Sequence, residues 1–444
     1  MLPSVVYVFS VHAGSPESAG QAGVAGVLAL AGKLEEVGHG RASVVVKPNL
    51  IHDRHPRDAN GWAYTLTHPS ILKEVLWQFD RLLPGGARIT LTDAPQGDAS
   101  FKNICRLLGL TELVADAGAA GREVQLLDLR KQESVNDEGV IVERRDLPGD
   151  PLGYVAVDLG EYSEFHGHAG AGRYYGADYD DNEVNYHHSD GRHEYLVSRT
   201  VLEADLFVNL PKLKTHKKVG VTAALKNLVG INGDKNWLPH HTEPSLANDG
   251  DERPVAGLLS RVERTAVRNL RHLSLKYPRS GIALLGGMRQ IGQKALGDGE
   301  SVVRSGNWWG NDTTWRMCLD LNKVLLYANP DGSLRKPAPE SQKPYLALVD
   351  GILGGQGNGP INPDPIQSNI VLFGSNPASV DAACAVFMGF DPDKIPLIRQ
   401  AFRCKHYPIA SWDWREVRVV SNRDEWNGYL HQIPPGSTPR FRPH

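Results

Sequence analysis

The fold is decided by one stretch of the chain, ADLFVNLPKLKTHKKVGVTAALKNLVGINGDKNWLPHH, residues 204–241. Residues 206–208 (LFV) form a short apolar run, which is typical of a buried strand in a parallel sheet. Asn209 ends that strand, because Pro211 has no N–H to donate to a strand ladder. The pattern then predicts a basic loop over residues 212–218 and a short helix over residues 221–229.

Positive charge is crowded in this stretch. Between residues 212 and 235 there are six lysines and one acid, Asp234. Such crowding is unfavourable unless something negative neutralises it. A strand end, a basic loop and a helix N-terminus together attract an anion, because free helical N–H groups and the helix dipole favour negative charge. A solvated basic loop is the alternative, but the apolar strand, Asn209 and the paired His240 and His241 favour a functional site.

Composition excludes several classes of protein. A chain of 444 residues suggests about two to three domains. Lys plus Arg is 48 and Asp plus Glu is 51, a net charge of −3, whereas a general nucleic-acid binder is usually basic. The first residues lack a signal peptide pattern, and no stretch approaches the roughly 20 apolar residues of a membrane helix. We therefore expect a cytoplasmic protein with neither a membrane nor a nucleic acid as partner.

The cysteines form no recognisable motif. They lie far apart, at Cys105, Cys318, Cys384 and Cys404, and show no CxxC spacing. This spacing indicates single buried thiols, without a disulfide framework, a zinc knuckle or an iron–sulfur cluster.

Strand and helix patterns alternate along the chain, which is typical of a doubly wound, largely parallel α/β sheet. We expect a two-lobed protein: a Rossmann-like α/β lobe over residues 1–150, a polar insertion rich in His and Tyr over 151–200, and a second α/β portion over 201–444. The insertion has no helical period, so it is predicted as a loop or β-rich excursion, and its histidines are expected mainly at the surface. Other predicted elements are helices over 101–117 and 251–276, strands over 345–349 and 370–373, and a loosely ordered Pro-rich tail.

Polar residues follow three predicted strands at points where proline ends the ladder. They are Lys47-Pro48-Asn49, Asp93-Ala94-Pro95 and Asn209-Leu210-Pro211-Lys212. Since ligands bind beyond the carboxyl ends of parallel strands, we expect these residues to line one cleft. A glycine-rich segment after Asp350 (GILGGQGNGP) would let the backbone approach a ligand closely, although it matches neither common nucleotide-binding pattern.

The blocks NLPKLKTH (209–216), KNLVG (226–230) and DGI (350–352) resemble the DUF362 family, and so do Lys47-Pro48-Asn49, Thr67-His68-Pro69 and the segment from Asn376 to Asp381. The resemblance covers roughly residues 43–395. It implies a two-lobed α/β protein of unknown function. Some relatives carry ferredoxin-type cysteine clusters, which this chain lacks. The family also looks distantly similar in fold to the lactate racemase group, but no catalytic residue of that group is carried over.

These observations lead to one main hypothesis, an enzyme of isomerase or transferase type acting on a small carboxylate- or phosphate-bearing substrate between lobes. A lysine among other cations has a lowered proton affinity, which suits a general base. The predicted catalytic residues are Lys212, Lys214, His216 and His68, and the predicted substrate-binding residues are Lys47, Asn49, Asn209, Lys226, Asn227, Gly355, Gly357 and Asn358. The cofactor is left open.

Two alternatives remain. The first is a metal-binding protein or metal-dependent isomerase, with Asp93, Asp350, His240 and His241 as candidate ligands of a divalent ion. The second is a non-catalytic binder of a polyanion or glycan, against which the near-neutral net charge argues.

Overall fold

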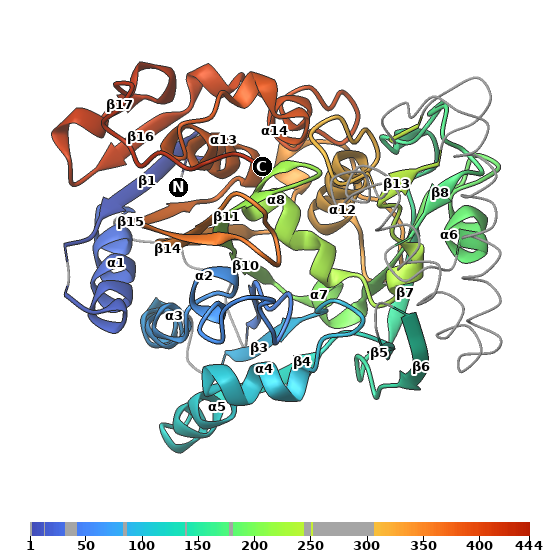
Figure 1. The fold of residues 1–444 in the computed structure, drawn as a ribbon, viewed down its shortest axis with the longest axis horizontal. Coiled ribbons are helices and arrows are strands. Elements are labelled where there is room, and N and C mark those ends of the chain that lie inside the picture. The colour runs from blue at the N-terminus through green and yellow to red at the C-terminus, as the bar shows by residue number, and fades with distance from the viewer. Residues whose placement is uncertain are drawn as a thin grey trace, which may run out of the picture.

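The computed structural model describes residues 2–12, 14–31, 42–82, 87–137, 140–176, 181–243, 250–251 and 306–444. Its centre is an 11-stranded sheet (Figure 1). The strands of this sheet are β1 (Val5–Ser10), β2 (Ser43–Pro48), β3 (Arg88–Asp93), β4 (Glu123–Asp128), β10 (Leu206–Leu210), β11 (Lys212–His216), β12 (Gly220–Thr222), β14 (Tyr345–Gln356), β15 (Asp364–Gly374), β16 (Arg418–Ser421) and β17 (Gly428–Tyr429).

The strand order is β17-β16-β1-β15-β14-β10-β2-β3-β4, with β11 beside β14 and β12 beside β11. Strands β14, β10, β2, β3 and β4 run parallel to one another, while β15 runs antiparallel between β1 and β14. The α/β class with a largely parallel central sheet is therefore confirmed. Strands from residues 1–150 and from residues 201–444 lie in this one sheet; the division into lobes stays a prediction.

Each face of the sheet carries its own hydrophobic core. In β2, Val44 and Val46 belong to one core and Val45 to the other; in β14, Leu348 and Val349 divide in the same way. The first core contains α1 (Pro16–Ala31), α3 (Pro69–Leu82) and α4 (Phe101–Leu108), and the second contains α12 (Thr314–Tyr327), α13 (Pro377–Phe387) and α14 (Pro396–Ala401). Because both faces are covered, the central strands are continuous apolar runs.

The segment predicted as a basic loop is instead the buried strand β11. Pro211 interrupts β10, but the chain then pairs with the second half of β14, with Lys212 opposite Asp350 and Lys214 opposite Gly355. The predicted helix over residues 221–229 is also different. Strand β12 pairs with β11, and only then does the short helix α8 (Ala224–Asn227) begin, followed by a 3-10 turn over Leu228–Ile231.

Other elements differ in length from the prediction. Strand β14 continues through the glycine-rich segment to Gln356, because it pairs with a β15 that is also longer than expected. The helix predicted over 101–117 is two helices, α4 and α5 (Leu110–Ala119), which meet at Gly109 with φ of 61°. The tail is packed rather than loose, since Phe441 is buried and the Arg442 N–H donates to the Gln356 side chain. Except for Asp251, the helix predicted over 251–276 lies outside the described residues.

The insertion is folded onto the second core. Its strands β7 (Tyr154–Asp158) and β9 (Glu194–Ser198) pair with each other, and β8 (Tyr174–Tyr175) pairs with β13 (His241–Thr242) beyond the insertion. Its histidines at 187, 188 and 193 are buried, not exposed as expected. The reason is packing, since Phe165 contacts the rings of both His188 and His193.

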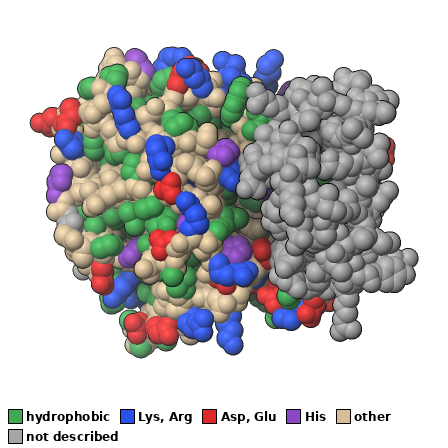
Figure 2. All heavy atoms as spheres, viewed as in Figure 1, with side chains coloured by type: hydrophobic (Ala, Val, Ile, Leu, Met, Phe, Trp, Pro, Cys, Tyr) green, Lys and Arg blue, Asp and Glu red, His purple; other side chains and the backbone are tan. Residues whose placement is uncertain are grey.

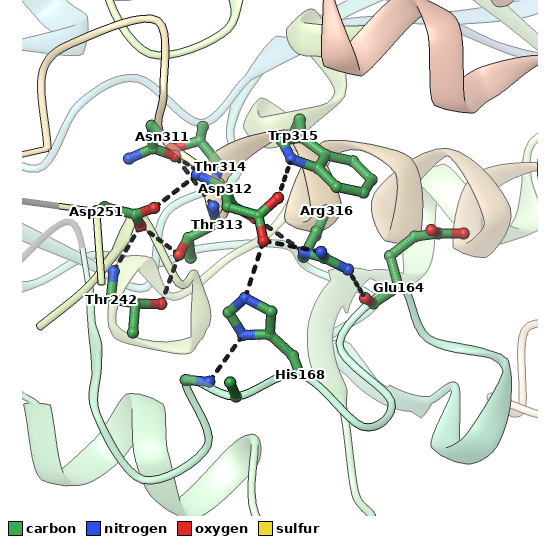
Figure 3. A network of polar contacts seen from close by, with 12 residues as sticks. Glu164, His168, Thr242, Asp251, Asn311, Asp312, Thr313, Thr314, Trp315 and Arg316 are labelled. Atoms are coloured by element: carbon green, nitrogen blue, oxygen red, sulfur yellow. Dashed lines mark hydrogen bonds and ion pairs between the residues drawn. The ribbon is translucent and has the colours of Figure 1, made fainter. Parts of the chain in front are cut away.

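A polar network fastens the insertion to the start of α12 (Figure 3). The Asp312 carboxylate is 3.2 Å from the His168 ring and accepts from Arg316 at 2.8 Å. Arg316 also donates to the Glu164 carbonyl, and Asp251 accepts the Asp312 backbone N–H.

Among the described helices, none combines the length and apolarity that a membrane span requires.

Helix α13 holds α8 in place through one carboxylate. The two Asp381 oxygens accept the Ala224 and Leu225 backbone N–H groups at 2.6 Å and 3.1 Å. Burial raises the pKa of Asp381 to about 8, against the effect of these two donors. Asp381 thereby satisfies the first free N–H groups of a helix too short to be stable alone.

Replacing Asp381 with Ala should therefore destabilise the protein. Each buried N–H left without an acceptor costs about 1–3 kcal/mol. Urea unfolding should show the loss in Asp381→Ala, whereas Glu425→Ala, which breaks an exposed pair with Arg423, should match the wild type. Equal stability of the two variants would contradict this role for Asp381.

Candidate functional site

Two of the predicted strand ends meet through a buried ion pair. Lys47 at the end of β2 lies 2.8 Å from Asp93 at the end of β3, and both side chains are 5% exposed or less. The second Asp93 oxygen accepts the Leu50 backbone N–H at 2.7 Å. Gly230 lies against this pair, since a Cβ there would be 1.9 Å from the Asp93 carboxylate. Both carboxylate oxygens of Asp93 are therefore bonded, and Gly230 packs against the pair.

Three asparagines connect β2, β10 and α8. The Asn49 amide donates to Asn227 at 3.1 Å, and Asn227 donates to Asn209 at 2.7 Å. Asn209 in turn donates to the Tyr345 hydroxyl at 2.8 Å and to the Ala224 carbonyl at 2.9 Å. This chain of amides uses both donors and acceptors and fixes the orientation of each side chain.

Lys214 is buried beside these amides, and no carboxylate among the described residues contacts it. Its ammonium donates to the Thr65 carbonyl at 2.6 Å and to Asn49 at 3.3 Å. Burial holds the pKa of Lys214 well below its usual range, and the nearby charges of Lys212 and Lys226 lower it further. A lysine in such surroundings holds its proton weakly.

Lys212 makes a second buried ion pair. Its ammonium is 2.8 Å from Asp350 Oδ2, and the same oxygen accepts the His68 backbone N–H at 2.9 Å. The His68 ring stacks on Trp62 and is 2.7 Å from the Ser70 hydroxyl. Burial lowers the pKa of His68, and the Lys212 charge adds to that effect while Asp350 opposes it. Two of the four predicted catalytic residues thus share an Asp350 oxygen, Lys212 through its ammonium and His68 through its backbone N–H.

Positive charge accumulates around α8. We use the name cationic cluster for seven side chains, those of Lys47, Lys212, Lys214, Lys218, Lys226, His216 and His240. Burial lowers the pKa of every one of these groups, that of Lys218 to about 8. Besides burial, the charge of Lys226 lowers the pKa of five other members, namely Lys47, Lys214, Lys218, His216 and His240.

Acidic groups balance only part of this charge. Asp93 and Asp350 pair with Lys47 and Lys212, and Asp251 raises the pKa of Lys218 from a distance. Within the part of the chain that the structure describes, no group accepts a hydrogen bond from the Lys226 ammonium or forms an ion pair with it. The cluster is therefore an electropositive region in which one half-buried ammonium lacks a protein partner.

The glycine-rich residues make backbone contacts and contacts at the surface, and one of them, Gly355, lies opposite Lys214 of the cluster in the pairing of β14 with β11. Gly355 of β14 pairs with Pro365 of β15. The Gly357 carbonyl accepts from the Thr215 hydroxyl, and the Gly357 N–H donates to the Arg442 carbonyl. The Asn358 side chain is exposed and contacts His444. These three predicted substrate-binding residues make structural contacts, because β14 extends through the glycines instead of ending before them.

The four candidate metal ligands are separated. Asp93 and Asp350 each accept from a different lysine, the His240 ring contacts the Leu238 carbonyl, and the His241 ring stacks on Tyr175. Among the described residues, no three His, Cys, Asp or Glu side chains are grouped in a way that could hold a metal ion. The donor set therefore gives the metal hypothesis no support.

Some site residues were not singled out from the sequence. Thr67 accepts the Asn49 N–H and donates to the Leu210 carbonyl, and Lys235 donates to the Ala94 carbonyl. Lys218 donates to the His240 carbonyl. Thr67 stands in the THP block and Lys218 in the KTHKK run, so both had a sequence signal. No sequence signal indicated that Tyr345 is a hydrogen-bond partner of Asn209.

Comparisons with known proteins add a family. The model of a domain of unknown function, DUF362, matches residues 148–386. No curated protein matches the chain. A crystal structure of a protein from Thermotoga maritima is similar at 11% sequence identity with a TM-score of 0.32, and the match covers 81% of this chain and 55% of that one. The chain thus spans about half of that protein's length, and a likeness this weak carries no functional argument.

The Lys47–Asp93 pair offers a test of the site's packing. Gly230→Ala would place a methyl group 1.9 Å from Asp93 Oδ1 and 2.7 Å from Lys47 Nζ, so the pair must separate. We expect a loss of about 1–3 kcal/mol, as for other overpacked positions. Chemical denaturation measures it.

Gly118→Ala is the matched control, because a Cβ there meets no atom within 4 Å and Ala is favoured over Gly in a helix. It should unfold at the same denaturant concentration as the wild type, or slightly later. A Gly230→Ala protein as stable as this control would show that the pair tolerates displacement.

Proposed function

Because the chain belongs to the DUF362 family, a domain of unknown function, we propose an activity from its own residues. The protein is an enzyme that binds a small anion, bearing a carboxylate or phosphate group, beside the carboxyl ends of β2 and β10 and the middle of β14. The anion neutralises the cationic cluster, and the asparagines Asn49, Asn209 and Asn227 fix the geometry around it.

The observation that carries this proposal is the state of Lys226. An ammonium group removed from water normally has a carboxylate or several acceptors around it. Lys226 has no such partner among the described residues, and its charge adds to burial in lowering the pKa of Lys47, Lys214 and Lys218. A bound anion would supply the missing counter-charge and would restore the ordinary proton affinity of these groups.

The placement of the cluster favours a small ion over a polymer. Lys47, Lys212 and Lys214 are almost fully buried, and Lys218 and Lys226 are only partly exposed. On the described part of the face in Figure 2, Lys and Arg side chains are scattered among acidic and apolar ones. A nucleic acid or acidic glycan would need a continuous exposed basic surface.

The reaction proposed is proton or group transfer, of the isomerase or transferase type. Lys214 holds its proton weakly and so suits a general base. His216 is its proposed partner; burial, and to a smaller extent the charge of Lys214, lowers the pKa of the His216 ring. The Lys212–Asp350 pair, to which His68 is bonded through its backbone N–H, is a second group that can hold or deliver a proton near the neighbouring strand end. Two such groups with different environments are what acid–base catalysis requires.

Anion binding should be visible as stabilisation. Sulfate, a simple mimic of a phosphate group, should raise the melting temperature of the wild-type protein in proportion to the logarithm of its concentration above saturation. Lys226→Met should lose most of this increase, because the ammonium without a protein partner is removed. Differential scanning fluorimetry in sulfate, against chloride at the same ionic strength, measures the difference.

Lys217→Met is the control. Lys217 precedes Lys218 in the chain, but burial alone lowers its pKa and no member of the cluster contributes. This variant should respond to sulfate as the wild type does. If Lys226→Met kept the full sulfate response, the cluster would not be the anion site.

The sulfate effect should also depend on pH. The pKa of Lys218 is about 8, below its usual 10.5, so raising the pH from 7 to 9 removes positive charge and should weaken sulfate binding. The ligand-free protein behaves oppositely: between the folded pKa and the unfolded pKa the unfolded chain holds more protons, so the contribution of Lys218 to stability rises with pH.

Melting temperatures at pH 7 and 9, each with and without sulfate, separate the two effects. The sulfate-dependent increment should shrink at pH 9. An increment that is constant or larger at pH 9 would mean that lysine protonation does not govern binding.

A further inference from the structure

Three lysines of the cationic cluster are closed off from solvent. Lys47, Lys212 and Lys214 are each at most 1% exposed, and Asn49 beside them is 5% exposed. A small anion can reach these groups only if a segment that covers them moves aside. The contacts of Lys214 identify such a segment, because its ammonium donates at 2.6 Å to the carbonyl of Thr65, the last residue of helix α2 (Trp62–Thr65).

Helix α2 belongs to a loop that is closed at its base. The chain leaves β2 and returns at Thr67, where the Asn49 N–H donates to the Thr67 hydroxyl at 2.8 Å and the Thr67 N–H donates to the Asn49 carbonyl at 3.1 Å. The first part of the loop is fixed as well, because the Asp53 carboxylate accepts the Ser100 N–H. We use the name lid for residues 54–65, which lie between these two anchored points.

Side chains of the lid contact one another more than they contact the cores. The Tyr64 hydroxyl donates to Asp58 at 2.8 Å, and the His55 ring packs edge-on against the Tyr64 ring. Among the described residues, neither hydrophobic core includes a buried side chain from the lid, and Trp62 only packs at the edge of the first core. A segment with so few core contacts opens at a lower cost in free energy than the strands that it covers.

The far side of the lid is attached to the turn between β14 and β15. Arg57 donates to the Asn362 side chain at 2.7 Å and forms an ion pair with Asp364 at 2.8 Å, and the His55 ring is 3.0 Å from the Pro363 carbonyl. The side chains of Arg57 and Asp364 are 52% and 39% exposed. Exposed ion pairs of this kind stabilise a structure only slightly, so they can separate without disturbing the cores.

We propose that the lid moves away from the turn between β14 and β15 and admits the anion to Lys214. The identity of the ligand rests on the proposed function; the motion goes beyond it. In the closed state the Thr65 carbonyl accepts from the Lys214 ammonium, and opening removes this acceptor, so the anion takes its place. Asn49, the other acceptor of Lys214, lies at the base of the loop and stays where it is.

The opened lid leaves no carboxylate unpaired at the surface. The second oxygen of Asp364 is 2.6 Å from Arg442 of the tail, and this ion pair does not involve the lid. When Arg57 moves away, Asp364 therefore keeps one positive partner, and the exposed Arg57 side chain is solvated by water. The cost of opening is then mainly the loss of a few polar contacts at the surface.

Acetylation of lysines tests the motion. N-hydroxysuccinimide acetate is uncharged and acetylates exposed, unprotonated amines, so a covered lysine reacts only while its cover is open. Arg57→Ala removes the contacts with Asn362 and Asp364, and the open fraction of the lid should rise about two- to fivefold, as for the loss of an exposed ion pair. The rate at which Lys214 is labelled in the full chain, followed by peptide mass spectrometry, should rise by the same factor.

Two controls make the test specific to the lid. Lys343 is another buried lysine whose ammonium donates to two backbone carbonyls, and burial lowers its pKa to about 8. Its labelling should be unchanged in Arg57→Ala. Arg145→Ala removes an arginine of similar exposure, 54%, that pairs with Glu143, and should leave Lys214 labelled at the wild-type rate.

Hydrogen exchange identifies the segment that moves. The Tyr64 and Thr65 N–H groups both donate to the Gly61 carbonyl within the lid, and they should exchange faster in Arg57→Ala than in the wild type. The N–H groups of Asn49 and Thr67 at the base of the loop should exchange at the wild-type rate. Faster exchange at the base as well would mean that the loop unfolds from its anchors, and would overturn a lid confined to residues 54–65.

Sulfate connects the lid with the anion site. Sulfate bound to Lys214 should slow the acetylation of Lys214 and leave that of Lys343 unchanged. Equal labelling of Lys214 in Arg57→Ala and in the wild type, or none in either protein, overturns the lid, whereas stabilisation by sulfate would still support the anion site.

Two further outcomes separate the lid from the proposed function. Faster labelling of Lys214 and Lys343 together in Arg57→Ala overturns the lid, because the whole chain would then be opening. Faster labelling of Lys214 alone, in a protein that sulfate does not stabilise, supports the lid and counts against the anion site.

Discussion

The structure depends on burying several lysines at the ends and edges of its central strands. Removing an ammonium from water is costly unless it is paired and hydrogen-bonded. Lys47 and Lys212 meet this requirement with Asp93 and Asp350, and Lys214 meets it with a carbonyl and an amide. The carboxyl ends of β2, β3 and β10 lie beside one another, and β11 then brings Lys212 opposite Asp350 in the middle of β14, which makes these pairings possible.

The two cores explain how such a polar region is held rigid. Apolar side chains of the same strands pack against helices on both faces, so the strand ends have little freedom to separate. The asparagine relay then connects β2, β10 and α8 within that frame. Rigid positioning matters for catalysis, because a polar site that need not reorganise stabilises developing charge most effectively.

Part of this could be predicted from the sequence. The alternation of apolar runs with helical patterns led to the sheet. Lys47, Asp93 and Asn209 were predicted to line one cleft because each follows or ends a strand. In the structure Lys47 pairs with Asp93, and Asn227 donates to both the Lys47 carbonyl and Asn209; that these residues line a ligand cleft stays a prediction. That inference needs only the rule that parallel strands end at one edge.

The remainder depends on tertiary contacts. Pro211 suggested a loop, and only the unusual length of β14 gives residues 212–216 a strand to pair with. The glycines after Asp350 looked like a ligand loop, but β15 pairs with them. The support of α8 by Asp381, 157 residues away along the chain, has no local signature. Nor does a sequence show which lysines of this stretch are left without a partner among the described residues.

The pairing of β8 with β13 joins the insertion to the cluster's edge. Tyr175 accepts the His240 backbone N–H at 2.8 Å, and its ring stacks on His241. Residues 151–200 therefore serve as scaffolding for His240, and none of the seven side chains that define the cluster comes from them. Shortening this excursion would remove the backbone acceptor of His240 and the ring packed on His241, without changing any lysine of the cluster.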